Sequence, residues 1–283
     1  MIDRYHLRYF LAVVDTGNFS RAAAACNVSQ PTLSVGIAKL EKSLGRPLFA
    51  RTNRRVAMTD AGADLLAHAR TIEAGFAAAE RAVAGAAVAR TLRLGVLSTT
   101  PRRWIERFLS TQADRIEIVE GNERELRARL GRGRIDAALT ILRDGGGRAV
   151  LTEGYSLALA ATHPLAGRAL IRAEELAHEP MIVRRHCELL SETSRFFTAR
   201  GVRPFFPART VSDDRALAYV RARLGITIMP DGFRESGVVR VPLDGFDATR
   251  EIGVVVAPHA DARTLEPALA ALTDAIARDA DGG

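Results

Sequence analysis

The sequence predicts an α/β protein with three parts: an all-α-rich winged helix-turn-helix domain at the N-terminus, a long linker helix, and a two-lobed α/β domain. Two capped helical patterns and a basic hairpin occupy residues 18–58, and an alanine-rich stretch without proline follows. From residue 91, strand and helix patterns alternate. The predicted boundaries are 1–58, 59–90 and 91–283, with lobe I over 91–162 and 246–283 and lobe II over 163–245.

Helix caps and helical spacing predict the first part. Asp3, Ser20 and Ser29 are each placed to cap a helix, because their side chains accept amide hydrogens at a helix start. The third helix buries an apolar stripe that begins at Leu33, and Gly45 provides its left-handed end. Short polar side chains on the opposite face suit recognition of base edges in a major groove. The predicted base-contacting residues are Ser29, Gln30, Pro31, Thr32, Ser34, Val35 and Lys39.

A basic hairpin is predicted after this helix, with strands at 47–49 and 56–58. Arg51, Arg54 and Arg55 lie in or beside its turn. Arginine side chains bind phosphate oxygens well, so the turn could lie along a DNA backbone. An ordinary solvated turn would look the same in isolation. The neighbouring helix-turn-helix favours the phosphate interpretation.

The linker helix carries a heptad pattern of apolar residues at spacings of 4, 3, 4, 3 and 4. A long, protruding helix cannot bury such a stripe alone, which favours pairing with the same helix of a second subunit. The alternative is packing against its own C-terminal domain. The predicted dimerisation residues are Leu65, Ala69, Ile72, Phe76, Ala79 and Val83.

Composition limits the classes of function. The net charge is +7, and residues 1–60 hold nine Lys or Arg against four acids, so most of the basic excess lies in the predicted DNA-binding part. No membrane-spanning run or signal peptide is found, which predicts a cytoplasmic protein without membrane contact. The two cysteines, Cys26 and Cys187, fall in different predicted domains, so no structural disulfide is expected. No catalytic motif, cofactor motif or metal-ligand spacing is present, which argues against an enzyme, a cofactor or a metal.

Several short motifs resemble the DNA-binding domain of LysR-type bacterial transcription regulators. They are Leu7-Arg8-Tyr9-Phe10, Gly17-Asn18-Phe19-Ser20-Arg21-Ala22-Ala23, Val28-Ser29-Gln30-Pro31, Leu33-Ser34, Leu40-Glu41, Leu44-Gly45, Leu48-Phe49-Ala50-Arg51 and Thr59-Asp60-Ala61-Gly62. The resemblance implies a homodimer or homotetramer that binds double-stranded DNA, with RNA polymerase as a further partner. It also implies an effector domain similar to type 2 periplasmic binding proteins, with a small-molecule site between the lobes.

In lobe I, Ser98, Thr99 and Thr100 are predicted to contact this effector. They follow the first strand of the lobe and precede Pro101, so their hydroxyls and free amides could bind a small anion at a helix start. The alternative is a plain helix cap. By position in the resembled family, Arg143, Ser212, Asp213 and Thr227 are further candidates.

A second group, Arg184, Arg185, His186 and Cys187, should face the same cleft. Its arginines could pair with an anionic effector. Alternatively, they could lower the pKa of Cys187 and make a thiolate that reacts with peroxide. His186-Cys187 resembles the peroxide-sensing branch of the family, but no cysteine follows Cys187, so a reversible internal disulfide is not expected.

The sequence therefore predicts a sequence-specific DNA-binding transcriptional regulator controlled by a small-molecule effector. A thiol redox regulator acting through Cys187 and a sequence-indifferent architectural DNA-binding protein remain as alternatives. An operator-to-random specificity ratio near one would favour the architectural protein.

Overall fold

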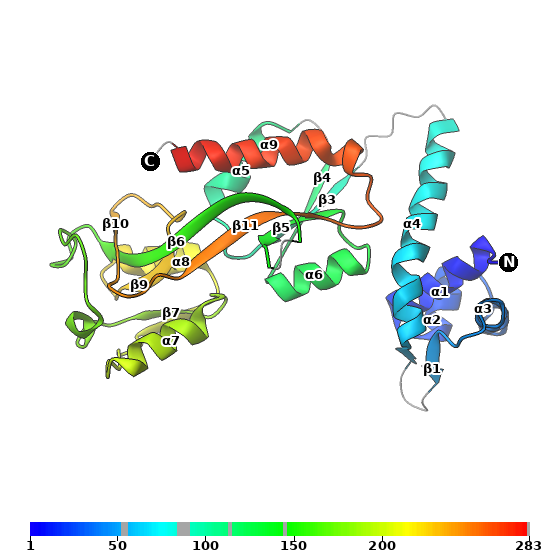
Figure 1. Ribbon diagram of the computed structural model, residues 1–283, viewed down its shortest axis with the longest axis horizontal. Helices are drawn as coiled ribbons and strands as arrows, with labels where there is room; N and C mark the ends of the chain where they lie inside the picture. Colours follow the sequence, from blue (N-terminus) through cyan, green and yellow to red (C-terminus); the bar gives the residue numbers. More distant parts are fainter. Residues whose placement is uncertain (52–55, 84–90, 113–114, 144–145, 282–283) are drawn as a thin grey trace.

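The computed structural model describes residues 1–51, 56–83, 91–112, 115–143 and 146–281 (Figure 1). Its N-terminal domain is a winged helix-turn-helix, as predicted, with the antiparallel hairpin β1–β2 as the wing. The elements are α1 (Arg4–Thr16), α2 (Phe19–Ala25), α3 (Gln30–Leu44), β1 (Phe49–Arg51) and β2 (Val56–Met58). Their buried apolar residues form one core under the three helices.

The predicted cap of α2 was wrong by two residues. Asn18, not Ser20, accepts the backbone N–H groups of Ser20 and Arg21. The helix already includes Phe19, so Ser20 lies inside its first turn. The other two caps are confirmed, since Asp3 caps α1 and Ser29 caps α3.

Gly36 lies in the interior of α3, where a glycine ordinarily lowers helix stability. A Cβ atom at this position would lie 2.6 Å from the ring of Tyr9 in α1. Gly36 is buried, so it faces the core of the domain and not a DNA duplex. The glycine therefore permits the close approach of α1 and α3, which sets the angle at which α3 is presented.

The linker helix α4 (Asp60–Val83) only partly matches the predicted dimerisation seam. Ala69 is 0% exposed and is therefore not available to a second subunit, and Leu65 is partly buried against the same core. Ile72 and Phe76 are 38% and 43% exposed, and Arg4 lies over the Phe76 ring at 4.2 Å from its centroid. The first turns of α4 thus complete the N-terminal domain, and the later turns are open to a partner. The side chain of Val83 lies outside the described residues.

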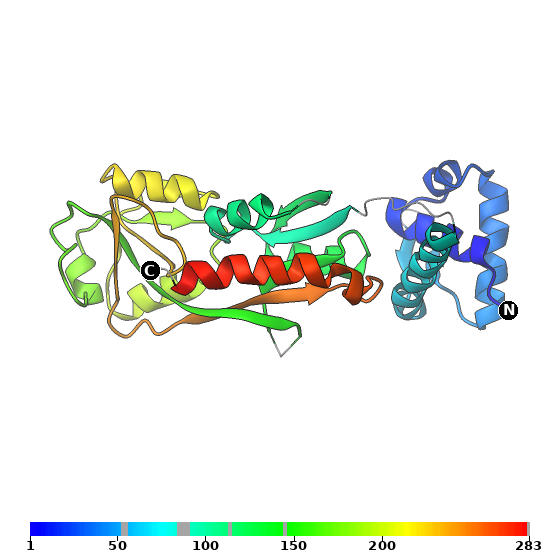
Figure 2. The same ribbon diagram turned by 90° about the horizontal axis from the view of Figure 1, so that it is seen from above.

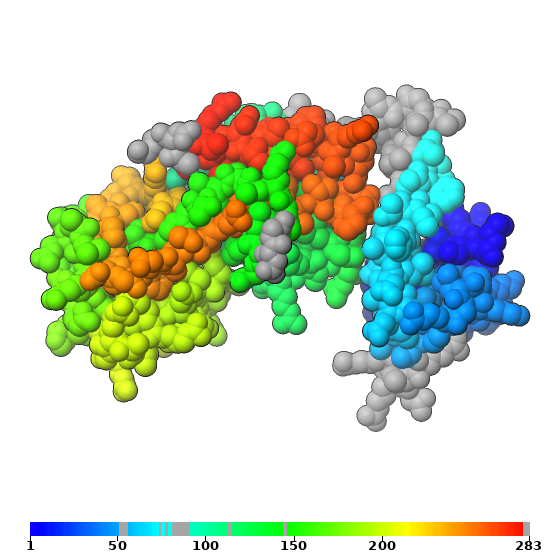
Figure 3. All heavy atoms as spheres, viewed as in Figure 1, coloured from blue at the N-terminus to red at the C-terminus, as the bar shows by residue number. Residues whose placement is uncertain are grey.

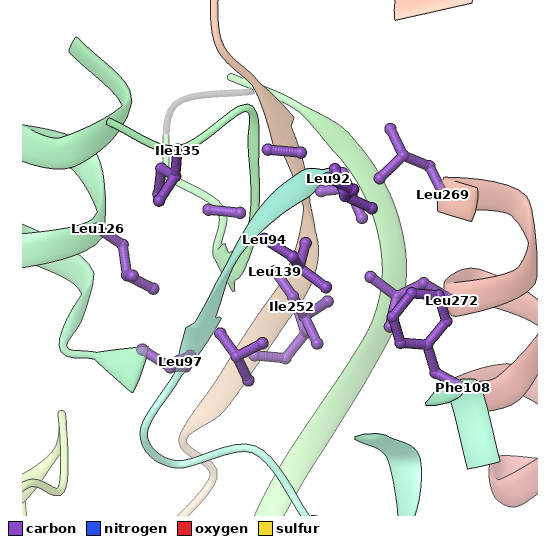
Figure 4. Close-up of a cluster of buried hydrophobic side chains, with 14 of the residues drawn as sticks. Leu92, Leu94, Leu97, Phe108, Leu126, Ile135, Leu139, Ile252, Leu269 and Leu272 are labelled. Atoms are coloured by element: carbon purple, nitrogen blue, oxygen red, sulfur yellow. The ribbon is translucent and has the colours of Figure 1, made fainter. Parts of the chain in front are cut away.

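Lobe I is a sheet with helices on both faces. Its strand order is β11-β5-β3-β4, in which β3 pairs in parallel with β4 and β5. Helices α5 and α9 cover one face and α6 the other (Figure 1). Leucine, isoleucine and phenylalanine side chains from these layers form the core shown in Figure 4. The elements are β3 (Leu92–Leu97), α5 (Arg102–Ser110), β4 (Ile116–Gly121), α6 (Glu123–Gly131), β5 (Ala137–Ile141), β11 (Thr249–Val256) and α9 (Ala262–Asp281).

Two strands connect the lobes. β6 (Arg148–Ala160) pairs with β11 through its first half and with β9 (Thr227–Pro230) and β10 (Val238–Val241) through its second half. β6 therefore contributes to both lobe cores. The pairing of these strands brings Tyr155 of β6 and Arg250 of β11 to the same place between the lobes.

Lobe II carries its own small parallel sheet. β7 (Ile182–Arg184) pairs with β8 (Ala208–Thr210), and helices α7 (Leu190–Ala199) and α8 (Asp213–Arg221) lie on opposite sides of it (Figure 1). A short 3₁₀ helix, η1 (Ala173–Leu176), was not predicted. Figure 2 shows the same molecule from above, with the N-terminal domain beside lobe I and far from lobe II. Among the described helices, none combines the length and the apolar character needed to cross a bilayer.

Candidate functional site

The amino end of α3 presents polar side chains to solvent. Gln30 Nε2 donates to Ser34 Oγ at 2.8 Å, and the Ser29 and Thr32 hydroxyl oxygens lie 2.7 Å apart. Gln30, Thr32 and Ser29 are exposed, and Ser34 is partly buried. Four of the predicted base-contacting groups therefore bond to one another when no DNA is present.

The remaining predicted DNA contacts are exposed where they are described. Pro31 and Lys39 are exposed, and Val35 is 55% exposed although it is apolar. The backbone of Arg51 ends strand β1. Its side chain, together with Arg54 and Arg55, lies outside the described residues. Figure 3 shows α4 lying between this N-terminal domain and lobe I.

A buried ion-pair network fills the interlobe seam, which we define as Thr99, Glu153, Tyr155, Glu188 and Arg250. Arg250 Nη1 donates to Thr99 Oγ1 at 2.9 Å and to Glu188 Oε1 at 2.6 Å, and Nε donates to Glu153 Oε1 at 2.8 Å. Arg250 is only 4% exposed. The Tyr155 hydroxyl also donates to Glu188 Oε1, at 2.6 Å. Arg250 therefore bonds to a residue of lobe I (Thr99), of the connecting strand β6 (Glu153) and of lobe II (Glu188).

The seam keeps Glu188 ionised. Burial disfavours its charge, but the Arg250 guanidinium and the Tyr155 hydroxyl outweigh burial, and the pKa of Glu188 is lowered from its ordinary value. Its second oxygen, Oε2, is buried without a hydrogen-bond partner in the described part of the chain, as is Thr100 Oγ1. These two oxygens are without a partner in the described part of the seam region, whereas the carboxylate oxygens that face Arg250 are already engaged by it.

The predicted anion site at Ser98, Thr99 and Thr100 is largely occupied by the protein itself. The backbone N–H of Ser98 donates to Gly121 O, and that of Thr100 donates to Leu97 O. The Thr99 hydroxyl accepts from Arg250. The expectation of free amides at this point was wrong for Ser98 and Thr100, because the Ser98 amide bonds to the end of strand β4 and the Thr100 amide closes a backbone turn.

The second-lobe candidates also have internal partners. Arg184 is buried and forms a bidentate pair with Asp213, with N–O distances of 2.6 and 2.7 Å. Ser212 caps α8, and the Thr227 hydroxyl donates to Ile182 O. In lobe I, Arg143 pairs with Glu123.

The thiol of Cys187 interacts electrostatically with Arg184, Glu188 and Asp213. Burial is the main cause that raises the pKa of its thiol, and Glu188 adds to it, while Arg184 acts in the opposite direction. The alternative in which arginines lower this pKa enough to make a thiolate is therefore contradicted, because burial outweighs the effect of Arg184. Arg185 and His186 are exposed to solvent.

A groove of about 930 Å³ lies in lobe II between α7 and the strands β7 and β8. We define the lobe II groove by its apolar wall, its hydroxyl-bearing α7 residues, its two exposed arginines, and Cys187 at the end near the seam. The buried Arg184, which is paired with Asp213, also lines it. The wall includes Ile182, Phe197, Val202, Phe206 and Ile228, the hydroxyls are those of Ser191, Thr193, Ser194 and Thr198, and the arginines are Arg203 and Arg209.

The sequence placed Arg184, Cys187, Thr227 and Thr99 at one cleft between the lobes, whereas the structure divides them between the lobe II groove and the seam. Sequence reasoning also missed the residues that organise the seam. Glu188 directly follows Cys187, and Arg250 is a charge at the start of a strand that is apolar from Ile252 on, which was an available signal. Tyr155 and Glu153 gave no signal, because their roles depend on the pairing of β6 with β11. Across the described residues, no cluster of three His, Cys, Asp or Glu side chains could hold a metal ion.

Comparison with known proteins identifies two domains. The family model described as "Bacterial regulatory helix-turn-helix protein, lysR family" matches residues 5–63, and "LysR substrate binding domain" matches residues 85–281. A "Probable hydrogen peroxide-inducible genes activator" from Mycobacterium avium is 35% identical over 238 residues, which cover 79% of this chain and 76% of that protein. The uncharacterised HTH-type transcriptional regulator YnfL of Escherichia coli is 31% identical over 91% of this chain and 93% of its own length.

Solved structures share the fold. ArgP from Mycobacterium tuberculosis has a TM-score of 0.75 at 20% identity and covers 98% of each chain. A variant of full-length OxyR from Pseudomonas aeruginosa has a TM-score of 0.66 at 23% identity, covering 98% of this chain and 95% of that chain. At these identities the similarity concerns the fold and not the ligand.

Proposed function

The chain belongs to the LysR family of bacterial regulators and is a DNA-binding transcriptional regulator with an effector-binding domain; we propose that it binds its operator as a homo-oligomer through the amino end of α3 and the wing. The observation that carries this proposal is the exposed polar end of α3, held at a fixed angle by the close contact of Gly36 with Tyr9. In this proposal Ser29, Gln30, Thr32 and Ser34 bond to base edges.

The other predicted contacts complete this interface. Val35 contacts a thymine methyl group, Pro31 adds an apolar contact, and Lys39 binds phosphate. Arg51, Arg54 and Arg55 of the wing bind the DNA backbone. Pairing of two α4 helices through Ile72, Phe76 and Ala79 presents two copies of α3 to successive turns of the duplex.

Gel-shift titration on the region upstream of the gene tests this proposal. Arg54→Glu should weaken binding to all sequences and flatten the salt dependence, because one phosphate contact is lost. Ser34→Ala should change sequence preference more than overall affinity. Ser43→Ala, at the far end of the same helix, is the matched control. Equal affinity for operator and random DNA would instead support an architectural protein.

We propose further that effector binding shifts the oligomer between two arrangements on DNA. A ligand can do this only by binding one arrangement better than the other. The regulated complex would act on RNA polymerase, in the cytoplasm, and the protein itself would catalyse no reaction.

A thiol redox regulator is the second candidate, because several relatives are described as hydrogen peroxide-inducible genes activators. The raised pKa of Cys187 speaks against a ready thiolate. Reporter output with and without peroxide, in the wild type and in Cys187→Ser, decides between the candidates. A peroxide response that Cys187→Ser abolishes would establish the redox function.

A further inference from the structure

The lobe II groove differs from the seam because two of its three arginines, Arg203 and Arg209, are not paired, whereas the buried Arg184 is paired with Asp213. Within the described residues, neither Arg203 nor Arg209 forms an ion pair, and both are exposed. Arg209 has an aromatic contact only, with its guanidinium 5.7 Å from the centroid of the Phe206 ring. Two cations at one open groove, with no carboxylate to neutralise them, create a positive potential that favours an anion.

The wall between these arginines and Cys187 is apolar. Phe197 and Val202 are buried at its base, and Phe206 is 40% exposed at its rim. Hydroxyl groups of Ser194 and Thr198 line the α7 side, where they are exposed to solvent. The volume of about 930 Å³ falls within the usual range for small-molecule sites. The groove thus offers one apolar surface and one cationic edge.

We propose that the lobe II groove binds a small organic carboxylate with an apolar body, and that this compound is the effector. Its carboxylate would contact Arg203 and Arg209, and its aliphatic or aromatic part would cover Phe197, Val202 and Phe206. This inference rests on the proposed regulatory function and adds the place and chemical class of the ligand.

The seam is a poorer place for the same ligand. A carboxylate that bound Arg250 would have to displace Glu188 or Glu153 and leave it buried without its counter-ion. A carboxylate in the groove loses no ion pair, because Arg203 and Arg209 have none to break. The groove and the seam share adjacent residues, since Cys187 lines the groove and the next residue, Glu188, bonds to Arg250 in the seam. A ligand against Cys187 can therefore act on the contact between the lobes.

The test uses the full-length protein and three probes: octanoate, benzoate and, as the neutral control, 1-octanol. We expect octanoate or benzoate to raise the unfolding temperature and 1-octanol to have a much smaller effect, because ligand binding stabilises the folded state. Arg203→Glu and Arg209→Glu should each weaken carboxylate binding about tenfold or more in calorimetric titration, since a charge-assisted contact becomes repulsive. Ser194→Trp, which fills the groove from an exposed position, should abolish binding.

Arg195→Glu is the matched control on α7, because Arg195 is exposed but does not line the groove. It should bind the acids as the wild type does. No binding of either acid, or binding that Ser194→Trp and both charge reversals leave intact, overturns the inference. Operator binding is measured on the same samples. If it persists while carboxylate binding fails, the regulatory function stands and only the ligand class and place are wrong.

Discussion

The interlobe seam and the lobe II groove each contain arginines, yet the arginines of the seam and the exposed arginines of the groove have opposite surroundings. In the seam, Arg250 is buried and donates to Thr99, Glu153 and Glu188. In the groove, Arg203 and Arg209 are exposed and have no carboxylate partner among the described residues. Position in the fold alone would have assigned the effector to the seam. The hydrogen-bond partners favour the groove.

The difference separates structural charges from charges that are free to bind. A buried arginine with two carboxylates is held in place by the same contacts that a ligand would need. Its removal therefore affects stability, whereas an exposed arginine contributes little to stability and can contribute fully to binding. Substitutions in the two regions should thus separate into large and small effects on unfolding.

The largest effect is expected for Arg250→Met. It leaves Glu153 and Glu188 buried without their counter-ion, and we expect a loss of about 3–5 kcal/mol in the free energy of unfolding. Trp104, the single tryptophan, is buried in the core of lobe I and reports urea unfolding through its fluorescence. Arg195→Met is the control, and a loss below about 1 kcal/mol for Arg250→Met would mean that the seam is not a stabilising ion-pair network.

Glu188→Gln should have a smaller and pH-dependent effect. Burial raises the pKa of Glu188, but Arg250 and Tyr155 lower it below the ordinary value of 4.5 overall. A lowered pKa in the folded state means that the ionised group contributes stability above about pH 4.5, and that this contribution is lost as the pH falls through the folded-state pKa. At pH 7 we expect the variant to be less stable by about 1.5–3 kcal/mol.

The difference between wild type and Glu188→Gln should stay constant from pH 7 to about pH 5 and shrink at lower pH. Urea midpoints measured at several pH values check this. A difference that grows as the pH falls would contradict the assigned direction of the pKa shift.

Tyr155→Phe removes one hydrogen bond to Glu188 and leaves the pair with Arg250 intact. We expect a loss of about 1 kcal/mol, smaller than for Glu188→Gln because the charge remains paired. Tyr219→Phe in α8 is the control, since Tyr219 is also partly buried in lobe II. Equal losses for both variants would remove the tyrosine from the seam network.

Local patterns predicted most of the fold. Caps, apolar periodicity and glycine ends located α1, α3 and most strands of the lobes, because these signals depend on neighbours in the sequence. The start of β6 at Arg148 was missed, since its first half follows a glycine-rich loop and pairs with β11, about a hundred residues later. The heptad spacing of α4 was correct as a pattern, but spacing cannot tell a partner subunit from the helix's own domain, which is where Ala69 packs.

Site prediction was limited for the same reason, because the sequence shows local patterns and not contacts between distant residues. The sequence placed Arg184 and Thr99 near a cleft, but it gave no means of knowing that Asp213 and Arg250 already bind them. Whether a charged side chain is free depends on contacts between residues far apart in the chain. Arg203 and Arg209 were not singled out for this reason, since neither belongs to a motif and only their lack of a partner makes them candidates.

The smallest effect on stability is expected for Arg209→Ala. The side chain is exposed and contacts only the Phe206 ring, so the free energy of unfolding should change by less than about 0.5 kcal/mol. The same variant should bind octanoate or benzoate more weakly than the wild type, because the cationic edge of the groove is reduced. Trp104 fluorescence and calorimetric titration on one preparation measure both quantities. A loss of stability above about 1 kcal/mol would place Arg209 with the structural arginines, and the contrast between groove and seam would then fail at this residue.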